Sequence, residues 1–308
     1  MMDGAKPLLE TPADNVRRFF YENITRKTFL KTVQAATFLG VMSTCLPKTF
    51  ATGNFTDELV ATSDTQYIRV TPDGNAEVLS KSEFVSGAKV EAARREEAIK
   101  SIMSSRASEI AKGEELKKLQ TSYNGYLSWY VKAYRTSLST ETYRLTGHYE
   151  WTTSPSTLGK DVFAVSYTNG LTHANNHNTA YSFQSKIYML SGEKKLLAKN
   201  VNQTSTSNVV YDKGGASIIQ DLATERPASG AGYVYKSENQ MGSLSFNVEV
   251  ASKASTGATV FATYYHRKNE KNLAISVSIP IGGSVSISDE SSYEQIGNNP
   301  TITFALNK

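Results

Sequence analysis

Apolar and polar residues alternate along most of the chain beyond position 123. In the clearest stretch, Tyr143, Leu145 and Trp151 share one set of alternate positions, and Arg144 and His148 share the other. Because successive side chains of a strand point to opposite faces, this pattern predicts strands with one buried face. Further strands are expected at 126–134, 161–167, 180–190, 208–212, 216–222, 230–235, 243–251, 256–266, 272–280, 283–288 and 301–306. The tyrosines of 123–134 also fit a helical spacing, so that segment has two interpretations.

Ten or more strands without intervening helices predict an antiparallel β-sandwich, or a barrel-like closure, over residues 123–308. The preceding segment, 81–122, is rich in Glu, Lys, Arg and Ala and carries a thin apolar stripe at helical spacing, so it is expected to be one long charged helix or two, with a break at Gly113. The fold class predicted is therefore mainly β, with a charged helical segment before the β domain.

Residues 52–80 are expected to combine a flexible start, up to about position 66, with a β-hairpin. The hairpin arms are Tyr67–Val70 and Ala76–Leu79. They flank Pro72-Asp73-Gly74-Asn75, and Asp-Gly takes the positive φ of a tight turn readily.

The first 51 residues have the organisation of an export signal. A basic cluster at Thr25–Lys31 precedes an apolar stretch at Ala35–Leu46, and the small residues Thr49 and Ala51 follow. About twenty apolar residues are needed to span a bilayer, and this stretch is shorter, so we expect a cleaved signal rather than a membrane anchor. The mature chain is expected to be secreted or extracellular.

The segment Thr25-Arg26-Lys27-Thr28-Phe29-Leu30-Lys31 resembles the bacterial twin-arginine export motif, Ser/Thr-Arg-Arg-x-Phe-Leu-Lys. It matches at every position except the second arginine, which here is Lys27. The resemblance implies twin-arginine export, and the general secretory route is the alternative.

The chain has a single cysteine, Cys45, inside the apolar stretch of the signal. Acylation of Cys45 would make the protein a lipoprotein, whereas the simpler interpretation is a small apolar residue of the signal. Removing residues 1–51 leaves no cysteine, which excludes disulfides, thiolate zinc sites and iron–sulfur clusters from the mature domain. No cofactor is predicted.

The net charge of +4 belongs mostly to the signal. Residues 1–51 hold 7 of the 33 Lys and Arg and 4 of the 29 Asp and Glu, which leaves 26 basic and 25 acidic residues. A nearly neutral domain lacks the clustered positive charge that phosphate contacts need, so a nucleic-acid partner is not expected.

Histidines give weak signals for chemistry. His173 and His177 are four positions apart, but the turn formers around them indicate a polar loop rather than a metal-binding helix, so no metal site is predicted. His148 and His266 fall in strand patterns and are expected to be packed or half-exposed strand residues.

Aromatic residues offer the main candidate binding site. Tyr126, Trp129, Tyr130 and Trp151 could form a platform on which sugar rings stack, although packing in the core is the commoner role of such residues. A pair of carboxylates could instead serve glycoside hydrolysis if two of them converge in a cleft.

The stretch 244–288 alternates Ser and Thr with apolar residues over two hairpin-like arms, a pattern that fits a membrane-inserting β-hairpin as well as an ordinary pair of strands. The favoured function is a non-enzymatic surface or extracellular-matrix protein that binds a partner or polymer. A β-hairpin pore former is the first alternative, in which case, or with lipid on Cys45, the partner includes a membrane. An extracellular polysaccharide hydrolase is the second.

Overall fold

The computed structural model describes residues 57–137, 141–156, 159–168, 170–175, 178–191, 193–204, 206–222, 226–228, 232–251, 255–268, 275–288 and 290–306. These residues belong to one compact unit, Phe55–Lys308. The export signal, Cys45 and His177 lie outside the described residues.

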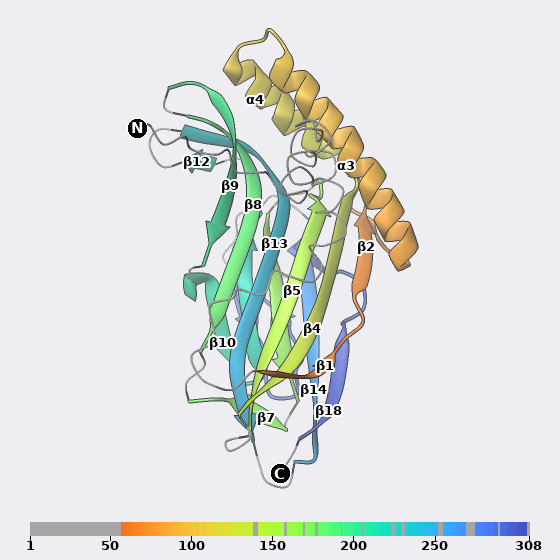
Figure 1. Ribbon diagram of the computed structural model, residues 1–308, viewed down its shortest axis with the longest axis vertical. Coiled ribbons are helices and arrows are strands. Elements are labelled where there is room, and N and C mark those ends of the chain that lie inside the picture. Colours follow the sequence, from red (N-terminus) through yellow and green to blue (C-terminus); the bar gives the residue numbers. More distant parts are fainter. Residues whose placement is uncertain are drawn as a thin grey trace, which may run out of the picture. The chain divides into compact units, whose positions relative to one another are not determined.

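The fold is mainly β, with antiparallel strands in two principal sheets (Figure 1). The larger sheet has the order β3-β2-β4-β5-β13-β8-β9, with β1, β12 and β7 paired to single members of it. Its strands are β1 (Glu58–Thr62), β2 (Gln66–Val70), β3 (Ala76–Val78), β4 (Gly125–Ser137), β5 (Thr142–Thr153), β7 (Leu171–His173), β8 (Ala180–Leu190), β9 (Leu196–Gln203), β12 (Arg226–Ala228) and β13 (Gly232–Val250).

The second sheet has the order β10-β11-β6-β14-β17, with β18 paired to β14. Its strands are β6 (Lys160–Tyr167), β10 (Val209–Asp212), β11 (Gly215–Asp221), β14 (Gly257–Arg267), β17 (Tyr293–Gln295) and β18 (Thr301–Ala305). A short hairpin of β15 (Val277–Ser278) and β16 (Ser286–Ile287) forms a separate ladder and packs on the second sheet, where Ile287 contacts Val162 and Tyr293.

One hydrophobic core joins the inner faces of the two sheets, which makes the fold a sandwich. Alternate residues of β5, including Tyr143, Leu145 and Trp151, enter this core and are almost fully buried. From the second sheet, Phe163 and Tyr264 meet them. The alternation that predicts the strands therefore also selects the residues of the core.

Residues 58–62, expected to be flexible, form β1 and pair with β4. The register shifts between Leu59 and Ala61, so this pairing contains a bulge. Ion pairs of Glu58 with Arg135 and of Asp57 with Arg144 hold the strand, and Ala61 packs against the core. The polar composition of the segment gives no indication that it forms a strand.

The helical segment contains α3 (Lys81–Ser104), α4 (Glu109–Lys118) and a 3₁₀ turn, η2 (Leu119–Ser122). Helix α3 begins with a capping box in which the Ser80 hydroxyl accepts from the Glu83 amide and the Glu83 carboxylate accepts from the Ser80 amide. The break falls before Ser108, which caps α4, and the prediction of a break at Gly113 is wrong. Gly113 lies inside α4 because its missing side chain lets the helix approach the ring of Tyr235 closely.

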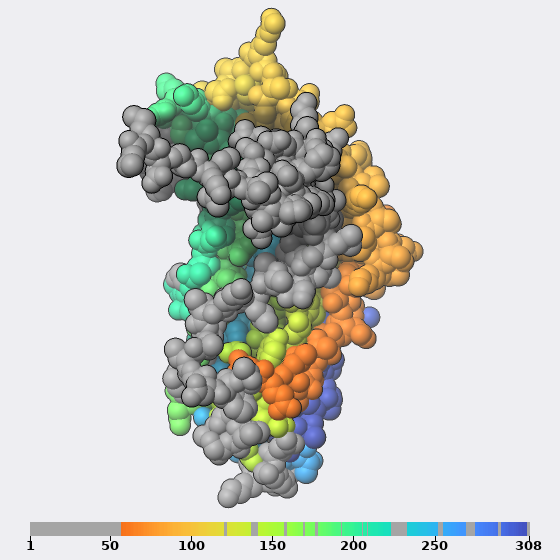
Figure 2. Space-filling model, viewed as in Figure 1, coloured from red at the N-terminus to blue at the C-terminus, as the bar shows by residue number. Residues whose placement is uncertain are grey.

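Helix α3 packs on the larger sheet through a face with few apolar residues (Figure 1). Phe84 and Ala88 pack against Tyr126, while Glu91 and Arg95 are buried beside them. The outer side of α3 lies on the surface, where Figure 2 shows it in orange, and Val85 and Val90 are exposed there. Burial of charged residues on the docking side explains why the apolar stripe is thin.

The segment 244–288 does not form two arms that pair with each other. Leu244–Val250 ends β13 in the larger sheet, and Gly257–Arg267 is β14 in the second sheet. Apolar residues of both strands, such as Phe246 and Val260, face the sandwich core. The alternation here matches an ordinary pair of sandwich strands.

Candidate functional site

The four aromatic residues predicted as a stacking platform lie in three different environments. Trp129 and Trp151 have no exposed surface and belong to the sandwich core. Tyr126 is buried under α3, where its ring meets that of Phe84 edge to face at 5.6 Å between centroids. Tyr130 is half-buried and lies beside Lys132 and His148. The four rings therefore do not share one exposed face.

The alternation along β4 already separates these residues. Trp129 occupies an odd-numbered position and points into the core. Tyr126 and Tyr130 occupy even-numbered positions, whose side chains point to the opposite face of the sheet. Trp151 points inward from the neighbouring strand. The alternation of residues along the two strands therefore predicts that both tryptophans point into the core.

Two of the three histidines that the structure describes, His148 and His173, form hydrogen bonds with neighbouring strands. His148 contacts the hydroxyl of Ser243 through Nδ1 at 2.8 Å, and burial lowers its pKa to about 4, with the charge of Lys132 adding to the effect. His173 Nε2 donates to the carbonyl oxygens of Asp212 (2.6 Å) and Gly215 (3.1 Å). Among the described residues no cluster of three potential metal ligands occurs.

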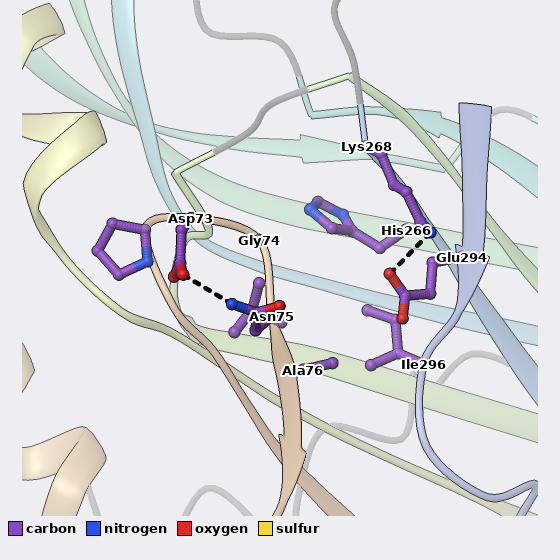
Figure 3. Close-up of a pocket in the computed structure, with 10 residues that line it drawn as sticks. Asp73, Gly74, Asn75, Ala76, His266, Lys268, Glu294 and Ile296 are labelled. Carbon is purple, nitrogen blue, oxygen red and sulfur yellow. Dashed lines mark hydrogen bonds and ion pairs between the residues drawn. The ribbon is translucent and has the colours of Figure 1, made fainter. Parts of the chain in front are cut away.

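A pocket of about 440 Å³ lies between the β2–β3 turn and the strands β14 and β17 (Figure 3). Its polar lining consists of Asp73, Asn75, His266, Lys268 and Glu294. Its apolar lining includes Val70, Pro72, Ala76 and Ile296. This volume falls in the range of about 300–1,000 Å³ that small-molecule sites occupy.

The turn on one side of the pocket is fixed by its own side chains. Gly74 adopts a φ of +87°, which favours glycine. The Thr71 hydroxyl donates to the Asp73 carboxylate, and the Asn75 amide nitrogen donates to the other Asp73 oxygen at 2.6 Å. These hydrogen bonds, with that of Thr71 first, lower the pKa of Asp73, so its carboxylate is charged at neutral pH.

An ion pair lies on the opposite side of the pocket. Lys268 Nζ is 3.2 Å from Glu294 Oε2, and both side chains are about half exposed (Figure 3). Antiparallel pairing of β14 with β17 brings them together, since His266 is the partner of Glu294 in that register.

His266 and Asp161 form a buried dyad behind the pocket. His266 Nδ1 is 3.0 and 2.9 Å from the two carboxylate oxygens of Asp161, and the two residues are 4% and 1% exposed. Tyr264 Oη donates to the same carboxylate at 2.8 Å, and the Arg267 amide donates at 3.2 Å. Because a carboxylate accepts, Nδ1 donates to it, and this contact orients the ring.

A chain of aromatic groups supports the dyad. Trp151 Nε1 donates to Tyr264 Oη at 2.8 Å, and Tyr264 in turn donates to Asp161. Burial raises the pKa of Tyr264 well above its usual value, and the Asp161 charge adds to the shift. The phenol therefore stays protonated and keeps donating to the carboxylate.

His266 Nε2 is buried and has no hydrogen-bond partner within the described part of the chain. His266 also lines the pocket. Local sequence patterns do not predict this pair, because Asp161 and His266 are 105 positions apart and meet through the pairing of β6 with β14. The alternation of residues within one strand does not predict how that strand is aligned with a strand far away in the sequence.

No protein-family model matches the chain, and no curated protein matches it. Among solved structures, it is similar to the pilus backbone protein RrgB from Streptococcus pneumoniae, with 9% identity over 55% of this chain and 69% of that chain, and a TM-score of 0.25. A score this low leaves the function to be argued from this chain alone. In the described residues, no helix combines the length and apolar character needed to cross a membrane.

Proposed function

We propose that this chain is an exported surface or extracellular-matrix protein that binds a partner or polymer through the pocket between the β2–β3 turn and β14. Export rests on the signal pattern of residues 1–51. Binding rests on the pocket, which is concave, partly apolar, and lined by several polar groups from different strands.

One observation carries the proposal. The polar side chains of Asp73 and Asn75 on the exposed β2–β3 turn lie across the pocket from the Lys268–Glu294 ion pair (Figure 3). A ligand in the pocket could therefore form hydrogen bonds with both sides at once, which is what a binding site requires.

The pocket favours binding over hydrolysis. Both of its carboxylates are engaged, since Asp73 accepts from Thr71 and Asn75 while Glu294 pairs with Lys268. A hydrolase needs a carboxylic acid that gives up its proton and a second group that attacks or activates water. The lowered pKa of Asp73, which follows from its hydrogen bonds, makes it poorly suited to the role of the acid.

Binding assays with the full-length chain test this proposal. The protein is immobilised and exposed to a panel of extracellular polysaccharides and matrix proteins. For any ligand found, the double variant Asp73→Ala/Asn75→Ala is expected to weaken binding about tenfold, because it removes two polar groups of the pocket.

The matched control is Asn200→Ala/Asn202→Ala on β9, at the opposite edge of the larger sheet. Both control residues are exposed, so folding should be unaffected. Equal binding by the two double variants would show that the ligand sits elsewhere, and the pocket would lose its role.

A further inference from the structure

Strand β9 forms one edge of the larger sheet and lies far from the pocket (Figure 1). We propose that two copies of this chain associate by antiparallel pairing of their β9 strands across a two-fold axis, with Asn200 opposite the partner's Asn200. The larger sheet would then continue from one protomer into the other. Three features of β9 support this pairing: its length, its free backbone groups and its own sequence.

Strand β9 is the longest edge strand in the part of the chain that the structure describes. It pairs only with β8 there, and its eight residues, Leu196–Gln203, run without a shift of register. Strand β3, at the other end of the same sheet, has three residues, and β10, at the edge of the second sheet, has four. Natural proteins protect long edges with proline, bulges or charged residues. Strand β9 has neither proline nor bulge, and Lys199 is its single charged residue.

The free backbone groups of β9 belong to alternate residues. The Leu196 amide donates to Glu109 Oε2 of α4 at 2.9 Å, so it points away from β8. Because the amide and carbonyl of one residue point to the same side of an antiparallel strand and those of the next residue to the other, Ala198, Asn200 and Asn202 also direct theirs away from β8. All three residues are exposed. This row of donors and acceptors matches the edge of another extended strand.

The sequence of β9 fits a second copy of itself. With Asn200 opposite the partner's Asn200, Ala198 lies opposite the partner's Asn202, and Lys199 lies opposite the partner's Val201. The three residues with free backbone groups then all take part in hydrogen-bonded pairs, and no like charges face each other. A register centred on Lys199 would instead place two lysines opposite each other. The two-fold pairing is therefore self-complementary in backbone groups and in charge.

The dimer would carry its two pockets far from the interface. The β2–β3 turn that lines the pocket lies at the edge of the larger sheet opposite β9. Under the function proposed above, such a dimer can bind two units of one polymer at the same time, which raises its avidity. The charge of residues 52–308, with 26 basic and 25 acidic residues, does not oppose association of two copies.

Sedimentation velocity of the full-length chain tests the association over about 1–300 μM, because an interface as small as one strand edge is weak. The expected result is a monomer–dimer equilibrium that shifts with concentration. Asn200→Pro removes a central amide donor that points away from β8, so the pairing with β8 is retained and dimerisation should weaken at least about tenfold. Asn200→Ala keeps the backbone amide and is the matched control, which should dimerise like the native chain.

Disulfide cross-linking tests the register. In a Cys45→Ser background, Asn200→Cys should join two copies under oxidising conditions, because hydrogen-bonded partners lie about 5.5 Å apart between Cα atoms, within the range of a disulfide. Lys199→Cys is the control, since Lys199 faces the partner's Val201 and the two copies of position 199 lie too far apart to be bridged. Cross-linking still tests the interface if Asn200→Pro fails to fold.

The outcomes separate this interface from the role of the pocket. A chain that stays monomeric over the whole concentration range, or equal dimerisation by Asn200→Pro and Asn200→Ala, would overturn the inference. Cross-linking of Lys199→Cys in preference to Asn200→Cys would overturn the pairing as well. Binding of a polymer through the pocket by a monomeric chain would refute the dimer and leave the proposed function intact.

Discussion

The buried charges between α3 and the larger sheet yield a ranking of substitutions. Glu238 accepts from Arg95 Nη1 at 3.0 Å and pairs with Lys236 Nζ at 2.9 Å. The side chains of Arg95, Lys236 and Glu238 are only 4%, 1% and 6% exposed. One buried carboxylate therefore serves two buried cations, so its loss should cost more than the loss of either partner.

The magnitudes follow from what each substitution leaves behind. Glu238→Gln removes the carboxylate that Arg95 and Lys236 share, and breaking a buried ion pair by removing one partner costs about 3–5 kcal/mol. Arg95→Met leaves Glu238 paired with Lys236, and the Asn124 carbonyl keeps its hydrogen bond from the Thr153 hydroxyl, but the buried carbonyl of Ser154 loses its donor, Arg95 Nη2. We expect a cost of about 2–3 kcal/mol for that variant.

Arg94→Met is the matched control, because it removes the same residue type one position earlier. Arg94 is 61% exposed and lies 3.4 Å from Glu91, a contact worth less than about 1 kcal/mol. Urea unfolding at pH 7 measures all three variants, with far-UV circular dichroism reporting the helices and Trp129 and Trp151 reporting the core. Glu238→Gln should lower the midpoint by about 1 M or more.

Acidification should remove the same contribution. Burial by itself would raise the pKa of Glu238, but Lys236 and Arg95 hold it below the usual value of 4.5. Since the folded-state pKa is the lower one, this stabilisation is complete above about pH 4.5 and is lost as the pH falls through the folded pKa. The ranking would be refuted if Arg95→Met cost no more than Arg94→Met, or if Glu238→Gln cost less than Arg95→Met.

Three further predictions concern α4, the outer face of the sheet and the export signal. Gly113→Ala should destabilise the protein by about 1–3 kcal/mol although alanine is the better helix former, because the added Cβ would lie 2.5 Å from the Tyr235 ring. Ala111→Leu, on the exposed face of α4, is the control. A Gly113→Ala variant that is more stable than the native protein would contradict the close contact with Tyr235. Because burial lowers the pKa of His148 from 6.5 to about 4, its contribution is complete above pH 6.5 and is lost toward pH 4, so His148→Gln should flatten the pH dependence of unfolding in that window. Residues 1–51 should export a fused reporter protein, and retention of the reporter in the cytoplasm would contradict the signal.

Strand pattern was predictable because it depends on neighbours in the sequence. The alternation of 143–151 selects the residues that enter the core, and the turn at Pro72–Asn75 joins the strands it was expected to join. The position of the helix break could not be predicted from Gly113, because a glycine is needed there for close contact with Tyr235, which lies 122 positions further along the chain. Tertiary contact overrides local propensity there.

The candidate site was hidden for a related reason. Each member of the Asp161–His266 dyad is an ordinary strand residue in its own segment, and only the register of β6 against β14 makes them partners. The aromatic residues were conspicuous in the sequence for the opposite reason. Large rings with alternating spacing are what a sandwich core requires, and Trp129 and Trp151 fill it.

Lack of a partner does not by itself mark His266 as functional. Arg95 Nε, Tyr149 Oη and other buried atoms also lack a hydrogen-bond partner within the described residues. Arg95 Nε belongs to a guanidinium whose other nitrogens are paired, and Tyr149 lies in the packed core. His266 Nε2 belongs with these atoms, because it too has almost no surface accessible to solvent. A molecule in the adjoining pocket can reach the exposed groups of the lining, Asp73, Asn75, Lys268 and Glu294, without any change in packing, whereas contact with Nε2 would require the surrounding residues to move.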